Sequence, residues 1–123
     1  SYYLHVQPGN CFIGAGLWHP EPESQRKIRQ FLFDNPGAWK AAVHSPAFRR
    51  RYTMDGETLV RPPRGFPADH ELIDDIKRKD FVATLGIEDS VVLGPRLRKA
   101  VADNFSALAP MMDYLCAALD LEL

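Results

Sequence analysis

The residues best suited to chemistry gather in residues 61–70, with the sequence Arg-Pro-Pro-Arg-Gly-Phe-Pro-Ala-Asp-His. Arg61 and Arg64 flank two prolines, whose rings restrict the backbone. Two permanent cations held with little freedom left to lose are suited to binding an anion. Alternatively, both arginines bind carboxylates of the chain itself, such as Asp69 or Glu57, or the carbonyl ends of helices. The sequence predicts a local anion site here and leaves this alternative open.

Two histidines are candidate proton-transfer groups, because an imidazole titrates near neutral pH. His70 follows Asp69 where a helix is expected to begin, and His19 follows a predicted strand. Adjacent residues on a helix do not face each other, so Asp69 does not activate His70. A catalytic role for His70 therefore requires a contact with Arg64 or His19 from elsewhere in the fold.

We predict no metal and no cofactor. His19, Glu21 and Glu23 alternate in a segment that, if extended, would put an imidazole and two carboxylates on one side. Their spacing matches no established metal motif, and the start of a helix explains both glutamates. His5 and His44 are isolated in the sequence and receive no functional role.

The cysteines and glycines exclude several other sites. Cys11 and Cys116 lie far apart and outside any paired spacing, which argues against a disulfide framework and a thiolate metal site. Such cysteine usage fits the cytoplasm. Residues 14–16, Gly-Ala-Gly, lack the third glycine of a dinucleotide-binding fingerprint.

The composition and net charge of the chain limit the classes of partner that we expect. With 46% hydrophobic residues, the 123-residue chain has the size and core of one domain spanning 1–123. The 15 basic and 16 acidic residues give a net charge of -1, so there is no overall attraction to nucleic acid or an anionic membrane. The cationic run 49–51 would spread around a helix, and no apolar run approaches the ~20 residues that cross a bilayer. We therefore expect neither nucleic acid nor a membrane as a partner.

The elements that position these groups follow from periodicity and proline placement. Alternation of apolar residues predicts strands, and proline in a first turn predicts helix starts. Asp69 is expected to cap a helix, with Asp74 and Asp75 pairing on the wet face with the residues four positions on. Strands are expected over 2–7, 11–18 and 81–87, and helices after residues 21, 35, 45 and 69, with two helices or one kinked at Pro110 closing the chain.

The first two strands predict a hairpin with an unusual face. Residues 7–10, Gln-Pro-Gly-Asn, have the composition of a type II turn. Phe12, Gly14, Gly16 and Trp18 then share one face, giving a shallow trough between two aromatic rings. Close packing of a helix is the commoner reason for glycines in a strand, and approach of a ligand is the alternative.

The pattern predicts an α+β fold. We expect a small, mainly antiparallel sheet that starts with the N-terminal hairpin and is covered by several helices mostly on one face, with two helices at the C-terminus. Trp18 and Trp39 are both candidates for the core. A sheet of this kind leaves its second face available to another element.

Residues 2–6, 14–22 and 61–70 resemble, in this order, the bacterial conserved hypothetical family called domain of unknown function 2461. The similarity extends over nearly all of the chain. It implies that a segment rich in arginine, aspartate and lysine precedes the first strand in longer members. We therefore expect this chain, which starts without methionine, to be a C-terminal half. The resemblance implies no biochemical activity.

Two functional hypotheses follow. The first is a binding or structural module whose arginine–proline loop, through Arg61 and Arg64, engages a small anion or an acidic protein partner. The alternative is an enzyme acting on an anionic metabolite, perhaps phosphorylated, in which the arginines hold charge and His70 or His19 moves a proton. Self-association through the face left open by the missing half is a further expectation.

Overall fold

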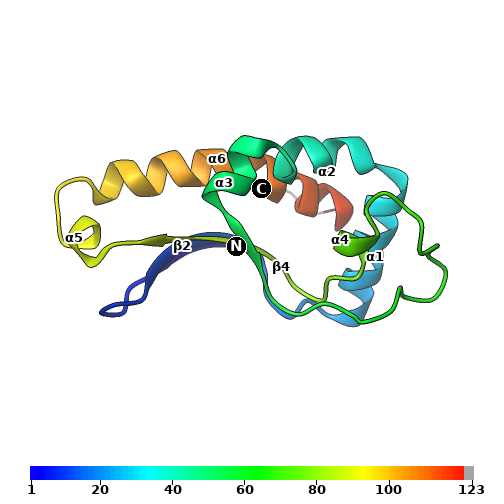
Figure 1. Ribbon diagram of the computed structural model, residues 1–123. Coiled ribbons are helices and arrows are strands. Elements are labelled where there is room, and N and C mark those ends of the chain that lie inside the picture. The colour runs from blue at the N-terminus through cyan, green and yellow to red at the C-terminus, as the bar shows by residue number, and fades with distance from the viewer. Residues whose placement is uncertain (121–123) are drawn as a thin grey trace.

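A computed structural model describes residues 1–120 as a sheet with helices packed on one of its faces (Figure 1). The described residues form a four-stranded sheet in the order β1-β2-β4-β3, with every neighbouring pair antiparallel. The predicted α+β class is confirmed. The elements are β1 (Tyr2–His5), β2 (Cys11–Leu17), α1 (Pro22–Asp34), α2 (Pro36–Val43), α3 (Pro46–Arg51), β3 (Thr53–Asp55), α4 (Ile73–Ile76), β4 (Phe81–Ile87), α5 (Asp89–Val92) and α6 (Leu97–Ala118).

The predicted type II turn joins β1 to β2. The backbone N–H of Asn10 donates to the carbonyl of Gln7 over 2.7 Å, and Gly9 has a φ of 74°, which glycine adopts without strain. The N–H of Gly9 also donates to the Asp89 carboxylate at the start of α5, at 2.9 Å to Oδ2. The tip of the hairpin is thus tied to a helix that follows β4.

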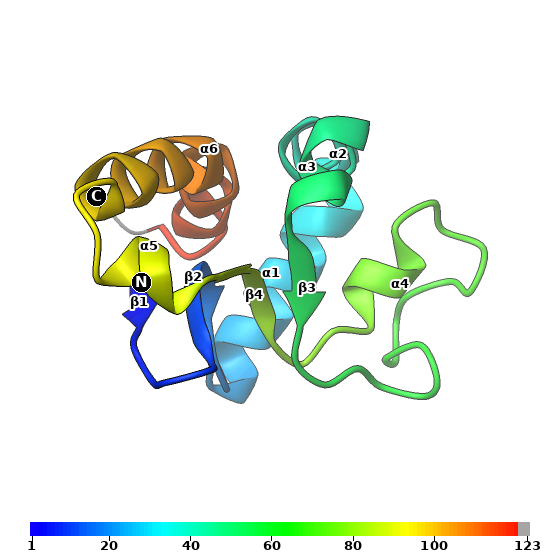
Figure 2. The same ribbon diagram turned by 60° about the vertical axis from the view of Figure 1, so that its left-hand side comes forward.

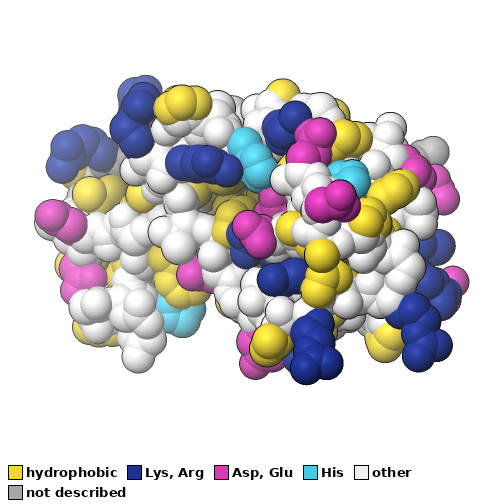
Figure 3. Space-filling model, turned by 45° about the vertical axis from the view of Figure 1, so that its right-hand side comes forward, with side chains coloured by type: hydrophobic (Ala, Val, Ile, Leu, Met, Phe, Trp, Pro, Cys, Tyr) yellow, Lys and Arg dark blue, Asp and Glu magenta, His cyan; other side chains and the backbone are white. Residues whose placement is uncertain are grey.

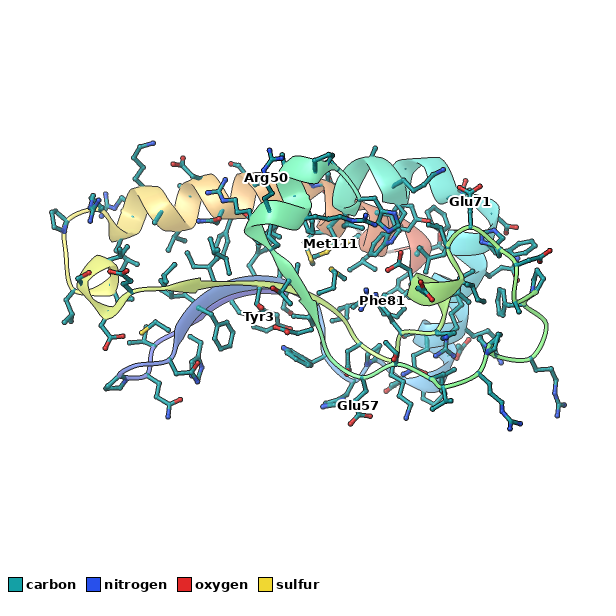
Figure 4. The ribbon with its side chains drawn as sticks, in the orientation of Figure 1. Tyr3, Arg50, Glu57, Glu71, Phe81 and Met111 are labelled. Atoms are coloured by element: carbon teal, nitrogen blue, oxygen red, sulfur yellow. The ribbon has the colours of Figure 1, made fainter. Side chains whose placement is uncertain are left out.

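The core lies between the sheet and the helices. Figure 4 shows Phe81 of β4 and Met111 of α6 in this layer and Tyr3 on the opposite side of the sheet. Trp39 is completely buried at the centre, with its ring 6.5 Å from that of Phe81. Trp18, by contrast, is 41% exposed and contributes little to the core.

The expectation that the β2 glycines make room for a helix is wrong. Ala15 belongs to the core under the helices, so alternation turns Gly14 and Gly16 toward the uncovered face. A Cβ on Gly16 would lie 1.9 Å from the carbonyl oxygen of Phe81, and the residue has a φ of 134°. The glycines therefore admit the backbone of the neighbouring strand β4.

The proline-marked helix starts are confirmed for α1, α2 and α3. The Ser45 hydroxyl accepts from the N–H of Phe48 at 3.2 Å and caps α3, whereas the Asn35 side chain makes no capping bond to α2. Asp69 does not cap α4, which is preceded by Leu72. Of the two predicted forms of the C-terminal segment, the structure has one helix, α6, which continues through Pro110.

Candidate anion-binding site

A cluster of charged side chains centres on Asp75 of α4, which is 4% exposed. Its Oδ2 lies 2.7 Å from Nε2 of His44, and its Oδ1 accepts from Nε of Arg78 at 2.8 Å. A buried carboxylate is costly unless hydrogen-bonded and paired, so these two partners explain why its charge is tolerated. Both carboxylate oxygens are thereby occupied by groups of the protein.

Three helices hold this cluster in place. His44 ends α2, where its ring extends toward α4, and Arg78 follows the short helix α4 so that its side chain reaches back three residues. Arg29 of α1 donates to the carbonyls of Ile76 and Arg78 at 2.9 and 3.0 Å. Because a helix leaves its last carbonyls without partners, this arginine supplies the missing donors and fixes the end of α4.

A hollow of about 120 Å³ lies beside the cluster. Its apolar wall comes from α2, α3 and β3, and its polar atoms come from His44, Asp75, Arg49 and Arg78. The hydroxyl of Tyr52, which also borders it, is engaged with Asn104 at 2.6 Å. Figure 3 shows a side of the molecule on which histidine, acidic and basic side chains mix near its middle. The hollow is lined by Val43, His44, Phe48, Arg49, Tyr52, Met54, Asp75 and Arg78.

The hollow has an excess of positive charge. Two guanidinium groups and one imidazole line it with a single carboxylate, and that carboxylate is already bound to His44 and Arg78. Within residues 1–120, Arg49 makes no ion pair and no side-chain hydrogen bond. An anion entering the hollow would therefore meet a cation whose charge no group among residues 1–120 neutralises.

The arginine–proline loop lies elsewhere, between β3 and α4, and Figure 2 shows this loop beyond the β3 edge of the sheet. Arg61 and Arg64 are both exposed. In the part of the chain that the structure describes, neither forms an ion pair or a side-chain hydrogen bond, and Glu57 lies instead 3.6 Å from Lys79. The internal clamp on Glu57 or Asp69 is thus not formed.

His70 has a local structural role. Its Nδ1 accepts from the backbone N–H of Leu72 at 3.0 Å, and its ring stacks on Phe33 at 4.9 Å. Among the described residues it makes no hydrogen bond with Arg64 or His19, the contacts that its catalytic role would require. His70 therefore stabilises the backbone of the segment that leads into α4.

His19 is joined to a second buried carboxylate, Asp80, which is 1% exposed. The backbone N–H of His19 donates to Asp80 Oδ1 at 2.7 Å, its Nδ1 lies 3.2 Å from the same oxygen, and Glu57 N–H donates to Oδ2 at 3.0 Å. Burial alone would raise the pKa of Asp80, but the two backbone donors and His19 outweigh it and lower that pKa below 3.8. His19 has a φ of 47°, a left-handed conformation that non-glycine residues seldom adopt.

Reasoning from sequence missed the cluster. Asp75 was expected to pair with Lys79 on the wet face of a longer helix; that expectation is wrong, because Asp75 is buried and pairs with Arg78 and His44. Asp75 follows Leu72 by three positions, so both lie on one helical face, and this was the available signal of burial. No sequence signal linked α4 to His44 or Arg49.

Two further properties concern residues 1–120. No helix there combines the length and apolar character needed to cross a bilayer. The same residues contain no group of three or more histidine, cysteine, aspartate or glutamate side chains arranged to hold a metal ion.

The fold and the hollow together define an α+β protein with a hollow lined by charged side chains beside the sheet. The chain belongs to the conserved hypothetical protein family DUF2461, whose model matches residues 1–114. This match confirms the family resemblance of the sequence and brings no activity with it. No curated protein and no solved structure matches the chain.

Proposed function

We propose that this protein is a binding module that takes a small anion, a phosphate or a short carboxylate, into the hollow beside Asp75. The observation that supports this most directly is the charge of the lining. Arg49, Arg78 and His44 border the hollow with one carboxylate, and that carboxylate is consumed by internal pairing. Arg49 would be the principal ligand because it has no competing partner within residues 1–120.

The pairing of His44 with Asp75 prepares the imidazole for this role. A carboxylate at Nε2 favours the proton on that nitrogen and fixes the orientation of the ring. The second nitrogen, Nδ1, is then left for the ligand. It accepts from a protonated ligand oxygen when the ring is neutral and donates when the ring is charged. A histidine held in this way accommodates both protonation states of a phosphate.

The size of the hollow supports a small ligand. Its volume of about 120 Å³ is several times what a single water requires, roughly 10–15 Å³ of probe-occupied volume. Pockets for larger organic ligands enclose about 300–1,000 Å³. Phosphate, sulfate and acetate are small enough for a hollow of about 120 Å³, whereas a nucleotide is too large. The arginine–proline loop with Arg61 and Arg64 is the competing location for the same anion.

The test is a titration of the protein with phosphate and with acetate, followed by backbone amide NMR signals. Arg49→Gln and Arg50→Gln form a matched pair, because both remove one charge from α3 and Figure 4 shows Arg50 on the outer surface of that helix. We expect Arg49→Gln to weaken phosphate binding about tenfold, the loss of one charged hydrogen bond of about 1.5 kcal/mol. Arg50→Gln is expected to change the dissociation constant by less than about twofold.

The double variant Arg61→Gln/Arg64→Gln distinguishes the competing location. If phosphate binds in the hollow, this variant keeps the affinity of the unmodified protein, and the shifted amide signals belong to α3, α4 and the end of α2. Loss of binding in the double variant, with Arg49→Gln unaffected, would transfer the site to the arginine–proline loop. If all variants lost a small and equal part of their affinity for phosphate, binding would depend on the net charge of the protein alone, and the proposal would be abandoned.

A further inference from the structure

The uncovered face of the sheet carries a second, chemically different hollow. We propose that this hollow binds a neutral compound with a hydroxylated six-membered ring, stacked on Trp18 and hydrogen-bonded by His19. The helices pack on the opposite side of the sheet, as Figure 1 shows, and Tyr3 in Figure 4 points to the side away from them. The site is independent of the anion-binding hollow proposed above.

The hollow has the volume and the lining of a small-molecule site. It is open to solvent and has a volume of about 420 Å³. Its border consists of residues from β1 and β2 and the residue that follows β2, namely Tyr2, Tyr3, Leu4, His5, Phe12 and Trp18. Volumes of about 300–1,000 Å³ with mainly aromatic walls are typical of ligand pockets. None of these residues is an aspartate, glutamate, lysine or arginine, so the lining favours a neutral ligand.

Two polar groups of the lining, the Tyr3 hydroxyl and Nε2 of His5, are already engaged, and flat ring faces are left for a ligand. The hydroxyl of Tyr3 donates to the carbonyl of Gly16 at 3.3 Å, and the His5 ring stacks on Phe12 with centroids 4.7 Å apart and 13° between planes. Nε2 of His5 lies 3.2 Å from the side-chain oxygen of Gln7. Aromatic faces of this kind attract another ring through stacking.

His19, which lies next to Trp18 and outside the residues that line the hollow, would supply the polar end of the site. Its ring centroid lies 6.0 Å from that of Trp18, and its side chain is 81% exposed. Asp80 lies 3.2 Å from Nδ1, which favours the proton on that nitrogen and leaves Nε2 of the neutral ring as an acceptor. Within residues 1–120, Nε2 has no protein partner. A hydroxyl on a ring stacked against Trp18 would therefore find an acceptor close by.

The backbone conformation of His19 gives independent support. Its φ of 47° is unfavourable for a residue with a side chain, and the buried Asp80 holds it through the backbone N–H as well as the ring. Strained residues that the surrounding structure fixes in this way cluster at binding and catalytic sites. The two contacts with Asp80 hold the exposed imidazole beside Trp18.

The experiment compares phenol, benzene and methyl glucoside as probes, with binding followed by the two indole N–H signals. Trp39 is completely buried and serves as the internal reference for Trp18. We expect phenol to shift the Trp18 signal alone and to bind at least about threefold more tightly than benzene, since one hydrogen bond is worth about 0.5–1.5 kcal/mol. Methyl glucoside tests whether the ring is that of a sugar; binding of either hydroxylated ring supports the site.

Three variants make the inference falsifiable. His19→Gly removes the imidazole acceptor, and glycine adopts a left-handed backbone without strain, so this variant is expected to bring phenol affinity down to that of benzene. Trp18→Ala should weaken phenol binding about fivefold, measured by the remaining amide signals, whereas Leu93→Ala, which removes another exposed apolar side chain, should leave it unchanged. Equal shifts of both tryptophans, equal affinity for phenol and benzene in the unmodified protein, or no binding of either hydroxylated ring would each overturn the proposal.

Discussion

Nε2 of His44 lies 2.7 Å from Oδ2 of Asp75, although the two residues are 31 positions apart in the chain. This contact joins the end of α2 to α4 across the entire segment that contains α3, β3 and the arginine–proline loop. Both groups can carry charge, and the carboxylate is buried. The contact is therefore a point where the stability of the fold and the chemistry of the candidate site depend on the same atoms.

Asp75→Asn is predicted to lower the free energy of unfolding by about 1–3 kcal/mol, because an amide removes the charge that neutralises Arg78 and cannot accept at both positions. Urea unfolding at neutral pH measures this. Asp74→Asn is the matched control, since Asp74 is exposed and makes no ion pair among the described residues; it should change stability by less than about 0.5 kcal/mol. Similar effects of the two substitutions would contradict a structural role for the buried pair.

Two glycines on paired strands predict opposite outcomes. Gly16→Ala should destabilise the protein by more than about 4 kcal/mol or prevent folding, because the new Cβ would collide with the backbone of Phe81 at an unfavourable φ. A Cβ on Gly86 meets nothing within 4 Å, so Gly86→Ala should be neutral or stabilise by about 0.5 kcal/mol. Thermal unfolding of the two variants compares them directly, and tolerance of Gly16→Ala would mean that the register of β2 against β4 is different.

The free energy of unfolding should depend on pH through the ionisation of Asp80. Its pKa in the folded protein lies below the ordinary value of 3.8, so the folded state binds this proton less readily than the unfolded state does. The resulting stabilisation is complete well above pH 3.8 and is lost as the pH falls through the folded pKa. We therefore expect urea unfolding to give a higher free energy of unfolding for the unmodified protein than for Asp80→Asn at pH 6. This difference in free energy should narrow below about pH 3.8. If the difference in free energy stayed constant from pH 6 down to the lowest pH at which the protein is folded, Asp80 would not be the source of the pH dependence.

The two tryptophans should differ in their contribution to stability. Trp39→Ala removes a completely buried ring and is expected to cost about 3–5 kcal/mol, whereas Trp18→Ala removes a ring that is 41% exposed and lies outside the core, and should cost less than about 1 kcal/mol. Denaturant unfolding followed by circular dichroism is suitable because it does not depend on tryptophan fluorescence. Comparable losses would show that Trp18 also contributes to the core.

Local patterns predicted the elements well. Alternation identified the strands that became β1, β2 and β4, and proline in the first turn located the starts of α1, α2 and α3. The covered face of β2 was harder to predict, because residues on both of its faces are small or apolar. Ile13 and Ala15 on one face and Phe12 on the other are all compatible with burial, and only the packing of α6 decides between the two.

The site was predictable only in part because its residues meet through tertiary contacts. A sequence displays neighbours three or four positions apart, whereas His44 reaches Asp75 from a different helix. A charged residue on a short helix is usually solvated, so burial of Asp75 contradicts the ordinary expectation. Among residues 49–51, three identical side chains give no indication that Arg49 is the one beside the hollow.

Pro110 gives α6 an internal boundary. The helix has 22 residues, from Leu97 to Ala118, and Pro110 lies within it. Because proline has no amide hydrogen, the carbonyl of Ser106 receives no helical hydrogen bond from position 110. The half after this point contains Met111 and Leu115 in the core, while the first turns of the helix carry no fully buried residue before Asn104. Amide hydrogen exchange should consequently proceed in two stages, with the first turns of α6 opening locally while the C-terminal half exchanges only when the whole domain unfolds.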